Sequence, residues 1–164
     1  MFLAESKGKT LLKALPKHAE GYRRVKVRKR KTKETFEQQF NDSFYTEFSD
    51  LRNRAVFVNG GSQNVTEDTE LFYVFPTDDY RFMYSPEVHE SSLLYKDTFN
   101  LLIKTAGENS GMSIFRDMLQ LSYQYDNLPH AIDLGCEIIL YDISHYYAVR
   151  KSLVDDYSKW FYTI

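Results

Sequence analysis

Phenylalanines recur every four positions between residues 33 and 52, at Phe36, Phe40, Phe44 and Phe48. Because an α-helix turns once in about 3.6 residues, this spacing places the four rings along one side. The stripe therefore predicts a helix over residues 33–52. Its aromatic ridge has to pack against either the core of this chain or a partner.

Alternation of apolar and polar residues predicts strands elsewhere. Between Tyr22 and Lys31 it places Val25 and Val27 on one face and basic residues on the other, at Arg24, Lys26 and Arg28. Stretches rich in Phe, Tyr and Val predict further strands over residues 54–58, 70–75 and 80–85. The last two are joined by the turn residues of positions 76–79, which predicts an aromatic hairpin.

Helix boundary signals follow the hairpin. Ser85 suits an N-cap and Pro86 a first helical position, and Gly107 suits a helix end. These signals predict a helix to Ala106 whose inward-facing leucines are Leu94, Leu101 and Leu102. Ser110 begins a further helix, which the stretch from Asp126 to Pro129 ends.

The C-terminal third has apolar residues with a period of about 3.5 between Ile132 and Ile164. This period predicts one or two amphipathic helices, which either close the core or form a seam for another chain. Residues 136–140 also suit a strand, because Gly135 disfavours a long helix there. If the seam binds a partner, the interface comprises Ile139, Ile143, Tyr146, Leu153, Tyr157 and Trp160.

Together these elements predict an α+β fold, with a small antiparallel sheet, an aromatic hairpin, the Phe-striped helix and a helical C-terminal half. A length of 164 residues indicates one domain. We expect residues 1–21 to form a basic irregular arm, because they combine basic side chains with Pro16 and two glycines. The short apolar segment at residues 11–15 would form a helical turn or two that docks on a neighbour, and residues 22–164 would form the domain.

Charge is distributed unevenly along the chain. Residues 1–33 carry twelve Lys or Arg and two Glu, whereas residues 34–164 carry nine basic and twenty-one acidic residues. An extended basic strand projects its cations about 7 Å apart, a spacing comparable with that of phosphates along a nucleic-acid strand. The sequence therefore predicts a polyanion-binding segment. Its candidate residues are Arg23, Arg24, Lys26, Arg28, Lys29, Arg30, Lys31 and Lys33.

Candidate catalytic and metal-binding chemistry is sparse. The four histidines His18, His89, His130 and His145 stand in no metal-ligand spacing, and Cys136 is the single cysteine. Asp142 and His145 would share a helix face as a surface pair. We assign no catalytic residue, metal or cofactor from the sequence.

The preferred function is therefore a non-enzymatic accessory protein whose basic segment contacts nucleic acid, or an acidic protein surface, within a homo- or hetero-oligomeric assembly. The alternatives are a structural subunit whose arm lies on a neighbouring subunit and an enzyme with an unrecognised site. The 13 Tyr, 12 Phe and one Cys resemble the composition of many small bacteriophage proteins. No run approaches the roughly 18 apolar residues of a membrane span or forms a signal peptide, so we expect a cytoplasmic or virion protein without a membrane partner.

Overall fold

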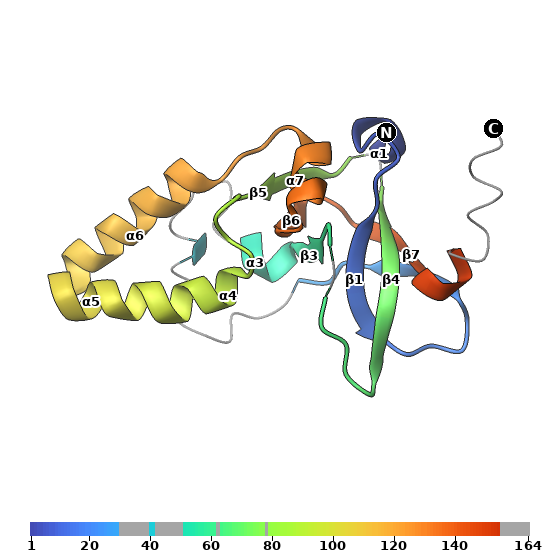
Figure 1. Ribbon diagram of the computed structural model, residues 1–164, viewed down its shortest axis with the longest axis horizontal. Helices are drawn as coiled ribbons and strands as arrows, with labels where there is room; N and C mark the ends of the chain where they lie inside the picture. The colour runs from blue at the N-terminus through green and yellow to red at the C-terminus, as the bar shows by residue number, and fades with distance from the viewer. Residues whose placement is uncertain (30–39, 42–50, 62, 78, 155–164) are drawn as a thin grey trace.

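The computed structural model describes residues 1–29, 40–41, 51–61, 63–77 and 79–154 (Figure 1). It has the α+β fold that the sequence predicts, with helices packed on a seven-stranded antiparallel sheet. The strands are β1 (Leu11–Pro16), β2 (Tyr22–Lys26), β3 (Val56–Asn59), β4 (Thr69–Pro76), β5 (Arg81–Tyr84), β6 (Glu137–Tyr141) and β7 (His145–Arg150). The helices are α1 (Phe2–Glu5), α3 (Leu51–Arg54), α4 (Ser91–Leu94), the π-helical turn η2 (Tyr95–Phe99), α5 (Asn100–Ala106), α6 (Glu108–Ser122) and α7 (Leu128–Leu134).

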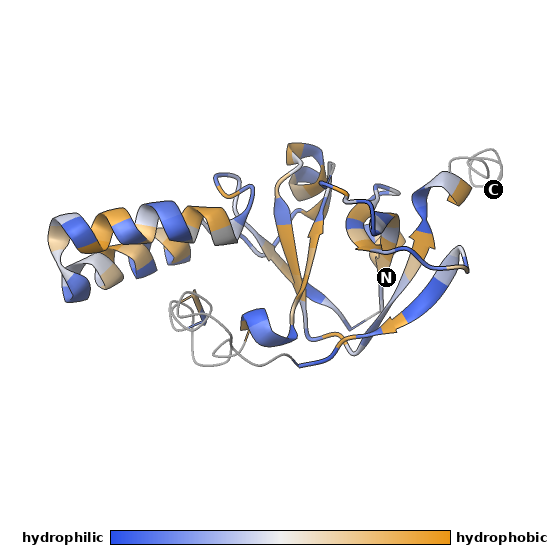
Figure 2. Cartoon of the chain, turned by 90° about the horizontal axis from the view of Figure 1, so that it is seen from below, coloured by the Kyte–Doolittle hydropathy of each residue, from blue (hydrophilic) through white to orange (hydrophobic). Residues whose placement is uncertain are grey.

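The sheet consists of two halves, joined where Leu12 of β1 pairs with Asn59 of β3. The strand order is β2-β7-β4-β1-β3-β6-β5, so β2 and β5 are the edge strands. Inner-face side chains of both halves, together with α1 and α7, form one hydrophobic core. In Figure 2 the hydrophobic residues gather on the strands in the middle of the molecule.

The expectation of an irregular arm over residues 1–21 is wrong, because Leu11–Pro16 forms β1 inside the sheet, between β4 and β3. Leu11 is fully buried, and Leu15 lies in the same core. The polar end of Lys13 is accommodated because its amine donates to the carbonyl of Phe57 at 2.7 Å. Phe2 of α1 packs edge-on against the ring of Phe75.

A second core covers the opposite face of β3, β6 and β5. Ile139 of β6 and Met83 of β5 are fully buried there against Phe115 and Leu119 of α6. Phe40, the one member of the predicted phenylalanine stripe within the described ranges, belongs to this core and is 1% exposed. Helices α5 and α6 form a hairpin that projects beyond the sheet (Figure 1). Most of the expected helix over residues 33–52, with the other three stripe residues Phe36, Phe44 and Phe48, lies outside the described residues.

The aromatic hairpin is not formed, although both of its strands are present. Strand β4 pairs with β1 and β7, whereas β5 pairs with β6. Because β4 already has a partner on each edge, the chain after Pro76 has to cross to the other half of the sheet. The two strands that are adjacent in sequence are therefore distant in the sheet order.

The prediction of helices from residue 132 onward is wrong over residues 137–150, which form β6 and β7. The alternative prediction of a strand over residues 136–140 is confirmed apart from its first residue. Four of the five residues of β6 are buried, so both of its faces are apolar and no alternation marks it in the sequence. The apolar period of about 3.5 residues is thus a coincidence of two strands and the turn between them.

The helix expected from Ser85 begins six residues later, at Ser91. The Ser85 hydroxyl accepts from the Glu87 amide, and the Val88 amide donates to the Ser85 carbonyl, so this stretch forms a turn that buries Val88. The predicted end at Gly107 is confirmed, with a φ of 83°. Leu101, expected to face inward, is 60% exposed.

Candidate nucleic-acid interface

The basic segment lies on strand β2 at the edge of the sheet, paired with β7. The predicted alternation is present: Arg24 and Lys26 are exposed, whereas Val25 is half-buried against the inner core. The amide of Val27 donates to the Ser144 carbonyl at 2.8 Å and extends the pairing beyond the strand. Arg28 follows with an exposed side chain. The fold therefore presents these cations on one outward face.

Arg23 has a different environment from the other cations of β2. Its guanidinium lies over the ring of Phe72, 5.3 Å from the centroid, and donates to the Pro16 carbonyl at 3.3 Å. Its Nε is buried and has no hydrogen-bond partner among the described residues. Arg23 thus packs on the inner face, directed away from the outward cations Arg24 and Lys26.

The outward cations of β2 have no carboxylate partner within the described part of the chain. No ion pair there joins Arg24, Lys26 or Arg28 to an acidic residue. Asp142 precedes β7 but is engaged by two other arginines, Arg54 at 2.6 Å and Arg81 at 3.6 Å. The positive charge of β2 is therefore available to an external anion. Lys29 is exposed as well, and the remaining predicted cations, Arg30, Lys31 and Lys33, lie outside the described residues.

Aromatic side chains lie beside these cations. Tyr147 of β7 pairs with Arg24 of β2, and Val149 pairs with Tyr22. Since alternate residues of a strand share a face, the outward positions of the two strands form one surface. We call this surface the outer β2–β7 face and define it by Tyr22, Arg24, Lys26, His145, Tyr147 and Val149. Tyr22 is 61% and Tyr147 is 42% exposed, and none of the six residues is acidic.

Tyr147 and Tyr22 were not identified as binding residues from the sequence. Finding them required the pairing of β2 with β7, which joins positions about 120 residues apart. The local signal was the alternation of residues 145–150, whose burial pattern is that of a strand. The apolar period of about 3.5 residues favoured a helix over these residues, so the strand alternation was not recognised.

The surface extends onto the next strand through Tyr73 of β4, which pairs with Val149. The amine of Lys151 lies over the Tyr73 ring, 5.9 Å from its centroid. At this distance the cation is attracted by the ring face. A further positive charge therefore lies beside the outer β2–β7 face.

The pKa of His145 is affected by the positive charges of this surface. Partial burial, followed by the nearby charges of Arg24 and Lys26, lowers the pKa of His145 below its ordinary value of 6.5. Its Nδ1 lies 2.9 Å from the Ser144 hydroxyl. His145 is consequently held neutral near pH 7 and can gain a proton when an anion approaches.

The partner interface predicted in the C-terminal third is largely internal. Ile139, Ile143 and Tyr146 are buried in the cores of this chain, at 0%, 7% and 4% exposure. This part of the prediction is wrong, because β6 and β7 use these side chains to fill the two cores. Leu153 is half-buried near Gly21, and Tyr157 and Trp160 lie outside the described residues.

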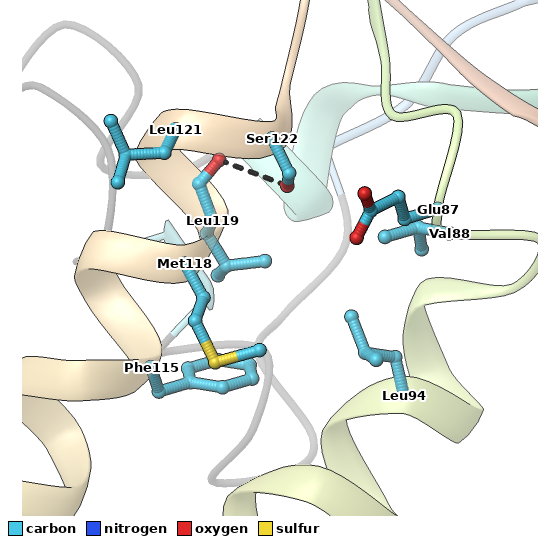
Figure 3. A pocket seen from close by; sticks show the side chains of 8 residues that line it. All are labelled: Glu87, Val88, Leu94, Phe115, Met118, Leu119, Leu121 and Ser122. Carbon is cyan, nitrogen blue, oxygen red and sulfur yellow. Dashed lines mark hydrogen bonds between the residues drawn. The ribbon is translucent and has the colours of Figure 1, made fainter.

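A hollow of about 360 Å³ lies between α6 and the segment that leads into α4 (Figure 3). Its lining is mostly apolar, and among the described residues that line it Glu87 is the one acidic or basic side chain. The Ser122 hydroxyl, also at the lining, donates to the Leu119 carbonyl at 3.4 Å. The described part of the lining therefore supplies no acid–base pair. The residues around the hollow are Glu87, Val88, Leu94, Phe115, Met118, Leu119, Leu121 and Ser122.

A charged cluster is buried beneath the helices. The guanidinium of Arg52 donates to the Ser91 hydroxyl at 2.5 Å and lies over the ring of Phe57. Glu137 accepts hydrogen bonds from Ser91, and burial raises its pKa although these bonds and the charge of Arg52 oppose the shift. Because Arg52 and Ser91 are almost fully buried, this cluster serves packing rather than ligand access.

The described residues offer little metal-binding or catalytic chemistry. No group of three or more His, Cys, Asp or Glu is placed there to hold a metal ion. Cys136 is buried, and burial raises the pKa of its thiol. The expected surface pair of Asp142 and His145 is not on a helix, because Asp142 lies in the turn before β7.

Comparison with known protein families, with curated proteins and with solved structures finds no match to this chain. In the described ranges, none of the helices has the length and apolar character needed to cross a bilayer.

Proposed function

We propose that this protein binds nucleic acid through the outer β2–β7 face, as a non-enzymatic accessory component of a larger assembly. The observation that carries the proposal is the exposure of Arg24, Lys26 and Arg28 without a carboxylate partner among the described residues. An exposed row of unneutralised cations attracts phosphates and releases their condensed counterions on binding.

The geometry of β2 suits a phosphate backbone that runs along the sheet edge. Side chains on one face of a strand are separated by about 6.5–7 Å, so successive phosphates can be met by successive cations. The pairing of β2 with β7 fixes the backbone of Arg24 and Lys26. This arrangement reduces the conformational entropy that a free basic tail would lose on binding.

An acidic protein surface is the competing partner for the same cations. The exposed rings of Tyr22 and Tyr147 favour nucleic acid, because bases offer flat faces that stack on aromatic side chains. Binding to an acidic polypeptide but to no oligonucleotide would therefore contradict the proposal.

The proposal is tested by removing three positive charges at two different places. The site variant carries Arg24→Gln, Lys26→Gln and Arg28→Gln. The matched control carries Lys96→Gln, Lys104→Gln and Arg116→Gln, which are exposed cations of η2, α5 and α6, respectively. Both variants have the same net charge, so a difference between them reports the position of the charge rather than its amount.

Binding of fluorescently labelled DNA and RNA oligonucleotides is measured by anisotropy at low salt. We expect the site variant to lose at least tenfold in affinity, as about three phosphate contacts are removed, and the control to bind within about threefold of wild type. Equal losses in both variants, or no binding by wild type, would contradict the proposal. Circular dichroism of both variants checks that the sheet is intact.

A further inference from the structure

We infer that the nucleic acid bound by this face is single-stranded and that its bases stack on Tyr22 and Tyr147. This inference rests on the proposed function and adds the class of substrate. The two rings lie among the cations of the face, with Tyr22 61% and Tyr147 42% exposed. Within the described residues neither ring makes an aromatic pair with another side chain.

The register brings the two rings near each other. Tyr22 pairs with Val149, and Tyr147 is two residues before Val149 on the same face of β7. Such diagonal neighbours have Cα atoms roughly 7–8 Å apart, within reach of aromatic side chains. Val149, which is apolar and half-buried, is directly opposite Tyr22 and two residues from Tyr147 on β7. Two rings and an aliphatic side chain therefore form a continuous platform for unpaired bases.

The cations lie on the side of this platform that a strand backbone would occupy. Arg24 and Lys26 are on the edge strand β2, whereas Tyr147 is on the inner neighbour β7. A single strand running along β2 would place its phosphates against the edge cations and turn its bases inward over Tyr147. Tyr73, with Lys151 over its ring, lies one strand further in.

Duplex DNA fits this surface poorly. A two-stranded ribbon enters the major groove, which is about 12 Å wide. Here the two-stranded unit of β2 and β7 continues into β4 and then β1. These four strands span about 14 Å between the axes of the outer two, before side chains are added. In a duplex the base faces are also stacked on one another and are closed to Tyr22 and Tyr147. Tyr22 and Tyr147 therefore have no base face on which to stack when the bound nucleic acid is a duplex.

The experiment compares three labelled probes of about 12 nucleotides: an oligothymidine, an abasic strand with the same phosphates, and a mixed-sequence duplex. It is carried out on the full chain by anisotropy. We expect oligothymidine to bind about tenfold more tightly than either other probe, because the abasic strand lacks ring faces and the duplex hides them.

The protein variants are Tyr147→Ala, Tyr22→Ala and Tyr147→Phe, with Tyr125→Ala as the matched control. Tyr125 is 43% exposed and adjoins Gln124, which bridges to β5 at the opposite edge of the sheet. We expect each of the first two variants to lose about tenfold in oligothymidine affinity, with no change in affinity for the abasic strand. Tyr147→Phe and Tyr125→Ala should bind as wild type.

The outcomes separate this inference from the proposed function. Equal binding of oligothymidine and the abasic strand, still abolished by loss of Arg24, Lys26 and Arg28, would overturn the stacking inference and leave the proposed function standing. Tighter binding of the duplex than of oligothymidine would overturn it in the same way. Absence of binding to all three probes would overturn both. Tyr22→Ala keeps the test decisive if Tyr147→Ala disturbs folding.

Discussion

Arg24 and Tyr147 lie directly opposite each other on the antiparallel strands β2 and β7, and both side chains are exposed on the same face. Directly opposed residues have Cβ atoms about 4.5–5.5 Å apart. A guanidinium and an aromatic ring are thus held side by side by backbone pairing rather than by a flexible loop. The proposed function and its substrate class both depend on this pair.

Protonation of His145 should be coupled to nucleic-acid binding. Its pKa is lowered by partial burial and by Arg24 and Lys26, and a bound phosphate would oppose the effect of these two cations and raise the pKa again. Affinity should therefore increase as the pH falls from about 7.5 towards 6. NMR titration of the His145 ring, with and without oligonucleotide, measures this shift, and His145→Gln should remove its contribution to the pH dependence. A ring pKa that is unchanged by ligand would contradict this prediction.

The same lowered pKa affects the stability of the unliganded protein. The folded protein binds a proton at His145 less tightly than the unfolded chain does. The contribution of His145 to stability is therefore fully present above pH 6.5, the ordinary pKa of the ring. This contribution is lost as the pH falls through the lower pKa of the folded protein. Removing the two neighbouring charges with Arg24→Gln and Lys26→Gln should move the ring pKa back towards 6.5. An unchanged value in that double variant would show that the two cations do not act on His145.

Leu11→Ala should destabilise the protein by about 2–5 kcal/mol, because Leu11 is fully buried in the inner core. Chemical denaturation followed by circular dichroism measures this loss. The control is Leu3→Ala on α1, where the side chain is 50% exposed and a change within about 0.5 kcal/mol is expected. An unaffected Leu11→Ala variant would mean that residues 11–16 do not belong to the folded sheet.

Gly60→Ala should destabilise by about 1–3 kcal/mol, because an added Cβ would lie 2.2 Å from the backbone oxygen of Ile132. Neither backbone can move without disturbing the contact between α7 and the end of β3. The adjacent Gly61→Ala is the control, since its Cβ would meet no atom closer than 3.5 Å. Thermal melting of the two variants compares them. Equal melting temperatures would contradict the close approach of α7 to Gly60.

Glu137→Gln should increase stability near neutral pH. Burial raises the pKa of Glu137 despite the opposing hydrogen bonds of Ser91 and the charge of Arg52, so the folded protein favours the neutral form. Wild-type stability should therefore fall as the pH rises from about 4.5 through the raised pKa, and the neutral amide should abolish this loss. Melting temperatures of both proteins between about pH 4.5 and 8 test the prediction. A variant that is less stable at every pH would show that the carboxylate is needed to neutralise Arg52.

Local patterns predicted the elements better than their partners. The alternation around Val25 identified β2 and its outward cations, and Gly107 marked the end of α5. Both are properties of a few neighbouring residues. The partner of β5, however, is β6, and nothing within residues 70–85 distinguishes that pairing from a hairpin with β4. Pairing depends on which edges are already occupied, and that is decided by distant residues.

Burial on two faces explains the other errors. Ile139 and Leu140 are both fully buried on opposite faces of β6, so the strand reads as a continuous apolar run. The basic side chains, Pro16 and two glycines of residues 1–21 predicted an irregular arm, and this arm included the apolar side chains of residues 11–15. In the structure the lysine between them, Lys13, reaches the carbonyl of Phe57 from within β1. The candidate site was thus only half predictable: its cations follow from β2 alone, whereas Tyr147 requires knowledge of the sheet.

The salt dependence of oligothymidine binding tests the central claim most directly. If Arg24, Lys26 and Arg28 contact about three phosphates of a single strand, the plot of log affinity against log salt should have a slope near −2 for wild type. The slope should approach zero when the three residues are changed to Gln, and it should stay near −2 for the control with Lys96, Lys104 and Arg116 changed. A wild-type slope near zero, or one that the site variant leaves unchanged, would contradict the assignment of this face to nucleic acid.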